Sequence, residues 1–346
     1  MRTTATRRRI VCGLLLAALA GAALAGCGSS SGSKTTAGTG TSTSAGAHKK
    51  IIYFVFAPRG FNDVTRAWAN GIDAGGQSLG SGFTVEQKAT GQAESDPAAY
   101  LTFIRTALVE HPDGIVVVPN NAAAMKTGLE QIAASGTPVL IMNQDVANMR
   151  GKVSFVGGSY TSAGQTAARW LIGEQQAGRL KSNEVGILRS TPGISTTDDG
   201  LTGFENALKG SALRVVSVLQ PSSLDSADAR AKAADMLTAH PNLGAIYSVT
   251  DIFGLGVARA LSDANRLDIK SISVDATPAT IHLMLTHRGI DAEVALNKYQ
   301  EGLLSVETLG KYLSGQQVPA SMPLSAKLIT ADNAQAYLQQ AAQLSK

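Results

Sequence analysis

The stretch HPNLGAIYSVTD at residues 240–251 decides the fold, because it has an echo, HPDGIVVVPN, at residues 111–120. In both copies a helical pattern stops at a histidine, and the proline that follows prevents the helix from continuing. A short apolar run comes next, and a run such as IVVV is typical of a parallel strand buried on both faces. Polar residues then follow each run, at the position where open α/β sheets bind ligands. The two copies therefore predict two similar α/β halves whose polar rims face a cleft.

Strand and helix patterns alternate along the rest of the chain from Lys49 onward. Strands are expected at residues 51–57, 83–88, 115–118, 138–142, 153–156, 184–188, 214–219, 245–249, 270–274 and 291–296. Helices are expected at residues 63–79, 97–110, 122–134, 162–176, 199–208, 226–239, 252–262, 278–287, 300–313 and 331–344. Asp96 and Asp225 are the expected N-caps of two of these helices. Strands separated by single helices form parallel βαβ units, so we expect an α/β fold with two doubly wound parallel-sheet lobes.

The first 26 residues are typical of an export signal peptide. An arginine-rich start is followed by an apolar run of 15 residues at 10–24, which is short for a membrane span. The sequence Leu24-Ala25-Gly26-Cys27 resembles the lipobox of bacterial lipoproteins, so we expect Cys27 to carry a lipid that anchors the protein to the cell membrane. The alternative is an ordinary signal peptide with a chance cysteine. Residues 27–48 continue as a tether rich in Gly, Ser, Thr and Ala, a composition that cannot form a core.

Charge and cysteine usage agree with an exported protein. The chain carries 30 Lys and Arg against 26 Asp and Glu, but four of the arginines lie in the signal peptide. The remaining chain is balanced at 26 basic and 26 acidic residues, so no nucleic-acid partner is expected. Cys12 leaves with the signal peptide and Cys27 is the expected anchor, so we expect no disulfide within the mature fold.

An enzyme would need a nucleophile, a metal site or an acid–base pair. His282 and His287 are five positions apart, whereas a spacing of four places two metal ligands on one helix face. The stretch GLG at residues 254–256 lacks the third glycine of a dinucleotide fingerprint. Asp198 and Asp275 could be a glycosidase pair, but the sequence does not fix their separation. We therefore expect no enzymatic activity, no cofactor and no metal.

The order of signal, lipobox, tether and lobes resembles the type I solute-binding proteins of ABC importers, and the sugar-binding, ribose-like branch is the nearest. HPDGIVVVPN, GTPVLIMNQD, HPNLGAIYSVTD and SISVDATP carry the resemblance, which covers about residues 49–330. It implies two lobes joined by a three-segment hinge that close on one small polar ligand, with crossings near residues 155–160, 296–299 and 322–326. The first lobe would be residues 49–157 plus 297–323, and the second lobe residues 158–296 plus 324–346.

Sugars are bound by planar polar side chains that make paired hydrogen bonds to adjacent hydroxyls, with an aromatic face against the ring. In the first lobe, Asn62 lies where the family often has an N-P-F motif, and Phe61 could supply one stacking face instead of simple loop packing. Arg59 could bind an anion or a ring oxygen, or it could be a solvated loop residue. Asn143 and Gln144 end a strand where sugar binders often carry Asp-Arg. Trp68 lies at helical spacing and is expected in the core.

In the second lobe, Asp275 follows a buried strand and matches the family's ligand-binding aspartate, although it could instead cap the next helix. Thr250 and Asp251 match an Asn-Asp pair, with Thr250 departing from the pattern and Asp251 equally able to serve as a cap and hinge support. Asp198 stands in TDDGLTGF (residues 197–204), where ribose-like relatives have an arginine. It is a ligand-binding candidate, and the alternative is that it only caps the helix. This departure implies a polyol, another neutral sugar or a cationic ligand in place of ribose. Asn297, at a crossing segment, is a further candidate.

The resemblance implies an extracytoplasmic substrate-binding protein, a monomer that captures a sugar or polyol and delivers it to an ABC permease. Two alternatives stay open: a sensor that presents its ligand to a membrane receptor, and a transport protein for an amino acid, amine or nucleoside. A sugar-responsive transcription regulator would need a DNA-binding helix-turn-helix where the export signal stands. We expect ligand binding to favour the closed lobes over the open ones and so to shift the hinge equilibrium.

Overall fold

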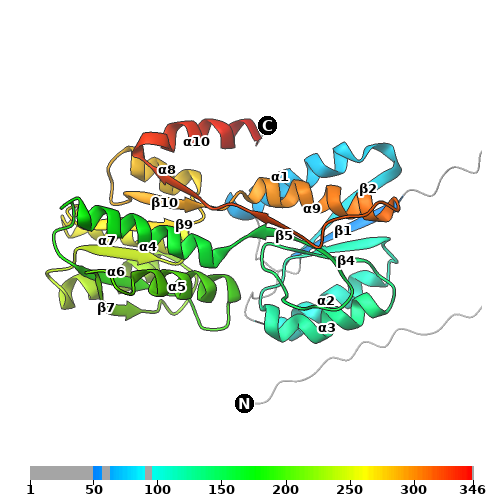
Figure 1. Cartoon of the computed structure of the whole chain (residues 1–346), viewed down its shortest axis with the longest axis horizontal. Coiled ribbons are helices and arrows are strands. Elements are labelled where there is room, and N and C mark those ends of the chain that lie inside the picture. Colours follow the sequence, from blue (N-terminus) through cyan, green and yellow to red (C-terminus); the bar gives the residue numbers. More distant parts are fainter. Residues whose placement is uncertain (1–49, 57–62, 90–95, 345–346) are drawn as a thin grey trace, which may run out of the picture. The chain divides into compact units, whose positions relative to one another are not determined.

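The computed structural model describes residues 50–56, 63–89 and 96–344 (Figure 1). The expected signal peptide, the lipid attachment at Cys27 and the tether lie outside the described residues. The same holds for Arg59, Phe61 and Asn62, which follow the first strand.

The first lobe is built on a six-stranded parallel sheet in the order β11-β5-β4-β3-β1-β2. Its strands are β1 (Lys50–Phe56), β2 (Phe83–Ala89), β3 (Gly114–Val117), β4 (Val139–Met142), β5 (Lys152–Gly158) and β11 (Ser321–Leu324). Its helices are α1 (Asp63–Ser78), α2 (Pro97–Leu108), α3 (Ala122–Ala134) and α9 (Lys298–Leu313). Successive strand residues face opposite sides, so Phe54 packs in the cluster with Val306 of α9 while Val55 packs in the cluster with Tyr100 of α2. Helices therefore cover both faces of the sheet.

The second lobe repeats this architecture with the strand order β12-β10-β9-β8-β6-β7. Its strands are β6 (Glu184–Leu188), β7 (Arg214–Leu219), β8 (Ala245–Ser248), β9 (Lys270–Val274), β10 (Ala292–Ala295) and β12 (Lys327–Thr330). Its helices are α4 (Tyr160–Gln176), α5 (Ser195–Leu208), α6 (Ser226–Ala239), α7 (Asp251–Asp263), α8 (Pro278–Leu285) and α10 (Ala331–Leu344). β12 runs antiparallel to β10, and the other pairings are parallel. The two doubly wound lobes that the sequence predicts are confirmed.

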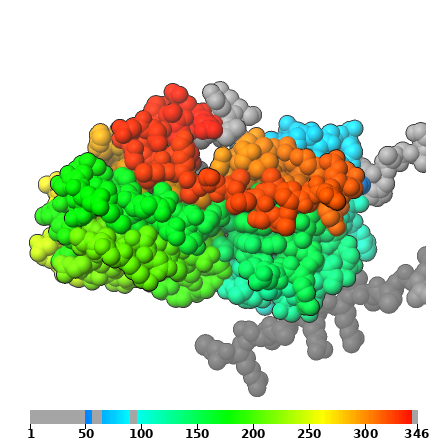
Figure 2. All heavy atoms as spheres, in the orientation of Figure 1, coloured from blue at the N-terminus to red at the C-terminus, as the bar shows by residue number. Residues whose placement is uncertain are grey.

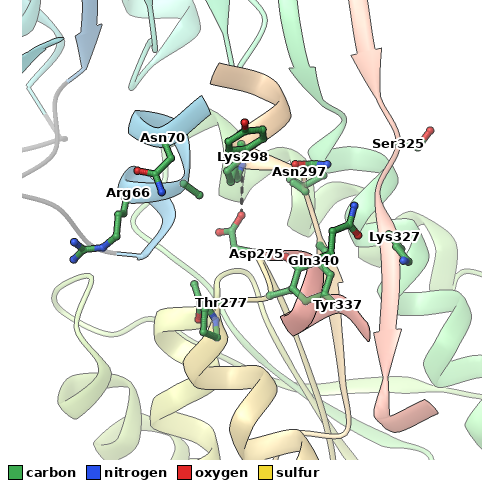
Figure 3. A pocket seen from close by; sticks show the side chains of 16 residues that line it. Arg66, Asn70, Asp275, Thr277, Asn297, Lys298, Ser325, Lys327, Tyr337 and Gln340 are labelled. Atoms are coloured by element: carbon green, nitrogen blue, oxygen red, sulfur yellow. Dashed lines mark ion pairs between the residues drawn. The ribbon is translucent and has the colours of Figure 1, made fainter. Parts of the chain in front are cut away.

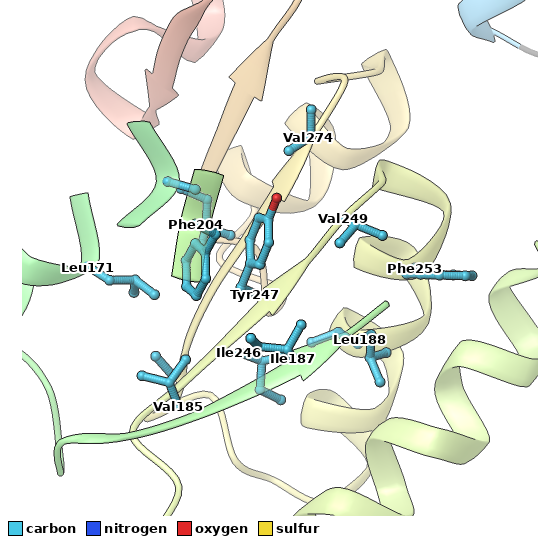
Figure 4. Close-up of a cluster of buried hydrophobic side chains, with 14 of the residues drawn as sticks. Leu171, Val185, Ile187, Leu188, Phe204, Ile246, Tyr247, Val249, Phe253 and Val274 are labelled. Atoms are coloured by element: carbon cyan, nitrogen blue, oxygen red, sulfur yellow. The ribbon is translucent and has the colours of Figure 1, made fainter. Parts of the chain in front are cut away.

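Stacked aromatic rings lie at the centre of the second lobe's core (Figure 4). The rings of Phe204 in α5 and Tyr247 in β8 are nearly parallel, with centroids 4.0 Å apart and an interplanar angle of 8°. Both residues are buried, and such a pair adds about 0.5–1.5 kcal/mol to the stabilisation from burial alone. The stretch at residues 240–251 thus supplies a central strand of the sheet and a central ring of the core.

The chain passes between the two sheets three times, between β5 and α4, between β10 and α9, and between β11 and β12. We call these three connections the hinge. They fall within the crossing segments that the family resemblance implies. Figure 2 shows part of this region on the surface, where the orange-to-red end of the chain runs from the first lobe onto the second.

Most expected elements are present, and the differences have local causes. Asp96 and Asp225 are confirmed as N-caps, since each side chain accepts hydrogen bonds from two backbone N–H groups. Helix α5 begins at Ser195, four residues before the predicted start. Strands β11 and β12 were not expected, because they are short, partly exposed edge strands without an apolar run. Among the described residues, no helix combines the length and apolarity needed to span a membrane.

Two glycines allow helices α1 and α9 to touch backbone to backbone beside the hinge. A Cβ atom at Gly71 would lie 2.0 Å from the carbonyl oxygen of Tyr299, and one at Gly302 would lie 2.5 Å from that of Trp68. No side chain fits at these distances without moving a helix. The close crossing places Trp68 of α1 within hydrogen-bonding distance of Glu301 of α9.

Replacing Gly71 with alanine should therefore destabilise the protein by about 1–3 kcal/mol, because the added methyl group forces the two helices apart. Urea unfolding followed by circular dichroism measures the change. Gly173→Ala is the matched control, since a Cβ at this position of α4 would meet no atom of another described element within 4 Å. Equal unfolding free energies for the two variants would contradict the close helix contact.

Candidate functional site

The carboxyl ends of strands from both sheets converge on a cavity of about 140 Å³, which we call the cleft. Its polar and aromatic lining includes Thr65, Trp68, Asn120, Asn143, Tyr160, Ser190, Thr196, Thr197, Thr250, Asp251 and Asp275. Most of these residues lie within three positions after the end of a strand, namely β3, β4, β5, β6, β8 and β9. Parallel α/β sheets bind ligands at this edge, so both lobes present their usual ligand-binding edges to the same space.

Hydrogen bonds join the lobes at two connections near the cleft. The Asn121 amide donates to the carbonyl oxygen of Gly193 at 2.7 Å, and the backbone N–H of Ala122 donates to Ser195 Oγ at 3.2 Å. The Gln144 amide donates to Asp199 Oδ2 at 3.0 Å. Each of these bonds links an element of the first lobe with an element of the second. The structure therefore shows the lobes in contact across the cleft.

A buried lysine on the hinge also connects the lobes. The ammonium of Lys298, which is 5 % exposed, lies 2.9 Å from Asn143 Oδ1 in the first lobe and 2.6 Å from the Tyr160 hydroxyl in the second. It lies 3.5 Å from Asp275 Oδ1 (Figure 3) and 3.7 Å from Glu301 Oε1. One buried charge thus holds groups that belong to both walls of the cleft.

Aromatic rings complete the surroundings of this ammonium. The Lys298 Nζ atom lies 4.8 Å from the ring centroid of Tyr160 and 5.5 Å from that of Trp68. Burial lowers the pKa of Lys298, but Glu301, Tyr160 and Asp275 raise it above its ordinary value. The lysine is therefore protonated at neutral pH, and its positive charge is attracted by the faces of the two rings and by the surrounding oxygen atoms.

Glu301 supports the lysine from the first lobe. Its side chain is fully buried and accepts hydrogen bonds from the Trp68 indole at 2.8 Å and from the backbone N–H of Gly158 at 3.2 Å. Burial raises the pKa of this carboxyl group, although the positive charge of Lys298 acts in the opposite direction. Trp68 is buried as the sequence predicts, but it also lines the cleft.

Two further carboxyl groups lie buried in the second lobe. Burial and the nearby charge of Asp275 raise the pKa of Asp251 to about 6, although the Thr277 hydroxyl donates to its Oδ2 at 2.9 Å. Burial raises the pKa of Glu293 to about 8, and its Oε1 accepts a hydrogen bond from Ser273 at 2.6 Å. Glu293 is thus predominantly protonated at neutral pH. Ionised Glu293 would add a further buried negative charge close to the carboxylates of Asp251 and Asp275, and their repulsion favours the neutral form.

The predicted site residues separate into two groups. Asn143, Thr250, Asp251 and Asp275 line the cleft together. Asn297 caps helix α9, where its side chain accepts from the backbone N–H of Gln300, and it lines a different cavity. The sequence left open that Asp251 and Asp275 are helix N-caps. In the structure the N-cap of α7 is Thr250 and the N-cap of α8 is Thr277.

Gln144 and Asp198 are not among the described residues that line the cleft. Gln144 bonds Asp199 across the lobes. The carboxylate of Asp198 lies 3.1 Å from the Arg189 guanidinium and accepts from the backbone N–H of Gly193 at 2.7 Å. Its charge is therefore compensated within its own lobe, and its influence on ligand choice stays a prediction.

The sequence reasoning missed Lys298, Tyr160, Glu301 and Glu293. A lysine directly after the crossing residue Asn297, with a glutamate three positions later, was the available signal for Lys298. No sequence pattern indicates that its partners come from the other lobe.

Replacing Lys298 with methionine should destabilise the protein by about 3–5 kcal/mol, because it leaves the carboxyl groups of Asp275 and of the fully buried Glu301 without their cation. Chemical denaturation at neutral pH measures the difference. Lys209→Met is the control, since Lys209 is exposed and its ammonium donates to Asn206 three residues away, with no acidic partner among the described residues. If both variants lose the same free energy, the buried cluster does not hold the lobes.

The raised pKa of Glu293 predicts a pH-dependent stability. Between its ordinary value of 4.5 and about 8, the native state keeps the proton that the unfolded chain has released. The free energy of unfolding should therefore fall as the pH rises, by at most about 1.4 kcal/mol per pH unit for one proton. Glu293→Gln removes this group, so its unfolding free energy should depend less steeply on pH. Denaturant titrations from about pH 5 to about pH 8 measure this dependence. Glu205→Gln, at an exposed position of α5, is the control. If the unfolding free energies of both variants change equally with pH, Glu293 does not carry the raised pKa.

The sequence is similar to a family model and to proteins of known function. A model described as the periplasmic binding protein domain matches residues 52–317. The ribose import binding protein RbsB of Escherichia coli (strain K12) is 24 % identical over 237 residues, which is 68 % of this chain and 78 % of that protein. RbsB of Bacillus subtilis (strain 168) is 25 % identical over 261 residues, 73 % of this chain and 82 % of that protein.

Solved structures show the same fold. GanP, a glucose-galactose binding protein from Geobacillus stearothermophilus, superimposes with a TM-score of 0.73 at 24 % identity, covering 82 % of this chain and 99 % of GanP. An ABC transporter solute binding protein from Bacillus halodurans C-125 with bound myo-inositol has a TM-score of 0.75 at 17 % identity, covering 86 % and 99 %. The two-lobed architecture is therefore shared with proteins of this fold.

Proposed function

The chain belongs to the periplasmic binding protein family, and we propose that it is an extracytoplasmic substrate-binding protein of an ABC importer for a sugar or polyol. The observation that carries the proposal is the cleft, where Asn143 of one lobe faces Thr250, Asp251 and Asp275 of the other. These amide, hydroxyl and carboxylate groups can donate to and accept from adjacent hydroxyls of one ligand. The ring of Trp68 supplies an apolar face for a sugar ring.

The charges around the cleft disfavour an anionic ligand. Asp275 is paired with the cation of Lys298, and the raised pKa values of Asp251 and Glu301 disfavour additional negative charge. The carboxylate of Asp198 is paired with Arg189. Asp251, whose pKa of about 6 leaves it largely ionised at neutral pH, accepts hydrogen bonds from the hydroxyls of Thr250 and Thr277. The hydroxyl groups of a neutral ligand would find donors and acceptors here, and the amine alternative is decided by the ligand screen.

Ligand capture in this proposal is a shift of the hinge equilibrium. The ligand contacts both walls and so binds the closed lobes more tightly than the open ones. The bonds of Asn121 to Gly193 and of Gln144 to Asp199 add to the stability of the closed state. A closed monomer, anchored by lipid at Cys27, would then deliver the ligand to the membrane permease.

A ligand screen on the purified protein tests this function. Pentoses, hexoses, polyols, amino acids and nucleosides are compared by the shift in thermal midpoint, and a ligand at 100 times its dissociation constant should add about 2.7 kcal/mol. We expect a sugar or polyol to give this shift. Stabilisation by an amino acid or amine alone would overturn the ligand class.

Asp275→Asn should then weaken binding of that ligand about tenfold or more, because hydrogen bonds to a charged group contribute about 1.5–3 kcal/mol. Calorimetric titration measures the affinity, and the thermal midpoint without ligand reports any loss of folding. Asp235→Asn is the matched control, since Asp235 lies on α6 in an exposed ion pair with Lys232. An Asp275→Asn variant that is folded and keeps the affinity of the control would remove Asp275 from the site.

A further inference from the structure

We propose that a second cavity, on the other side of Asp275 from the cleft, binds a small organic anion with an apolar body. This hinge cavity has a volume of about 350 Å³, within the range of small-molecule sites (Figure 3). Residues from α1, from the connections after β9 and β10, from the β11–β12 connection and from α10 line it. Among the described lining residues, Asp275 alone also lines the cleft, so the two spaces are distinct.

The charges around the hinge cavity are mainly positive. Arg66, Lys298 and Lys327 line it, and Asp275 is the only carboxylate in the lining that the structure describes. Asp275 is already paired with Lys298. Within the described part of the chain, Arg66 and Lys327 have no acidic partner. The cavity therefore offers two unpaired cations to an incoming anion.

Hydrogen-bond donors and helix ends add to this preference. Helices α8 and α9 both begin at the cavity, where their N-caps Thr277 and Asn297 form part of its wall. The N-terminus of a helix carries a partial positive charge, which stabilises a nearby anion. The amide of Asn70 and the phenol of Tyr337 also line the cavity, and in the described residues neither has a hydrogen-bond partner.

The remaining wall is apolar. Ala67, Ala276, Pro278, Ala295 and Leu296 line the cavity beside the aromatic ring of Tyr337. An inorganic ion would leave this surface without contacts. A carboxylate or sulfonate attached to an aromatic or aliphatic body would use both the cations and the apolar wall.

Several residues of the cavity wall come from the last part of the chain. The family match stops at residue 317, whereas Ser325, Lys327, Tyr337 and Gln340 of the lining lie beyond it. The lining also combines α1 of the first lobe with α8 and α10 of the second. Any occupant that contacts both lobes favours one hinge angle over others, so its binding is linked to the movement of the lobes.

Titration of the purified protein with 8-anilino-1-naphthalenesulfonate tests the proposal without any knowledge of the cleft's ligand. This dye joins a sulfonate to an aromatic body, and its emission rises in apolar surroundings. We expect saturable binding of one dye per chain. Arg66→Glu should weaken it at least tenfold by reversing an unpaired charge, and Ala67→Trp should abolish it by filling the cavity. Arg169→Glu, an exposed arginine of α4 outside the cavity, is the matched control and should bind as the unaltered protein does.

Thermal midpoints of all variants report folding, and Arg66 is exposed, so its replacement leaves the core intact. Equal dye affinity in Arg66→Glu and Arg169→Glu would overturn the proposal, because the dye would then bind elsewhere. Absence of saturable binding to the unaltered protein would overturn it as well.

Discussion

The buried ammonium of Lys298 is the interaction on which the arrangement of the two lobes depends. Removing a charge from water costs several kcal/mol, and only close oxygen partners with good geometry compensate for it. Here these partners are Asn143, Tyr160, Asp275 and Glu301, which come from both lobes. Separation of the lobes at this point would leave the cation poorly compensated. The hinge therefore holds together by electrostatics as well as by chain connectivity.

The helix contact between α1 and α9 makes this cluster possible. Gly71 and Gly302 remove the side chains that would keep the helices apart, and Trp68 can then donate its indole N–H to Glu301. Glu301 in turn lies beside Lys298. The close helix contact that the two glycines allow therefore positions the ammonium of Lys298. This ammonium in turn holds Asn143 and Asp275 at the cleft.

The sequence predicts those features that depend on neighbouring residues. Apolar runs identify most strands, and polar residues after them identify Asn143, Thr250, Asp251 and Asp275, because every parallel sheet presents its carboxyl ends at one edge. The Lys298 cluster was not predictable in this way. Lys298 and Asn143 are 155 positions apart, and Trp68 and Glu301 are 233 apart, so only the folded chain brings them together. The edge strands β11 and β12 escaped prediction because half-exposed strands carry no continuous apolar signal.

Asp275 joins the chemistry of the cleft to that of the hinge cavity. Its backbone has φ = 101°, and Ala276 after it has φ = 53°, both in the left-handed region that residues with a Cβ rarely adopt. Such a conformation costs about 1–3 kcal/mol per residue and persists only where surrounding contacts determine it. In this chain the backbone N–H of Asp275 donates to the carbonyl oxygen of Val294 at 2.9 Å, and its carboxylate pairs with Lys298. A group that shifts this carboxylate from either cavity must change the pairing, and through Lys298 it also acts on Asn143 in the opposite lobe. If both cavities bind ligands as proposed, binding on one side of Asp275 would therefore be linked to binding on the other, and by thermodynamic reciprocity the influence would act equally in both directions.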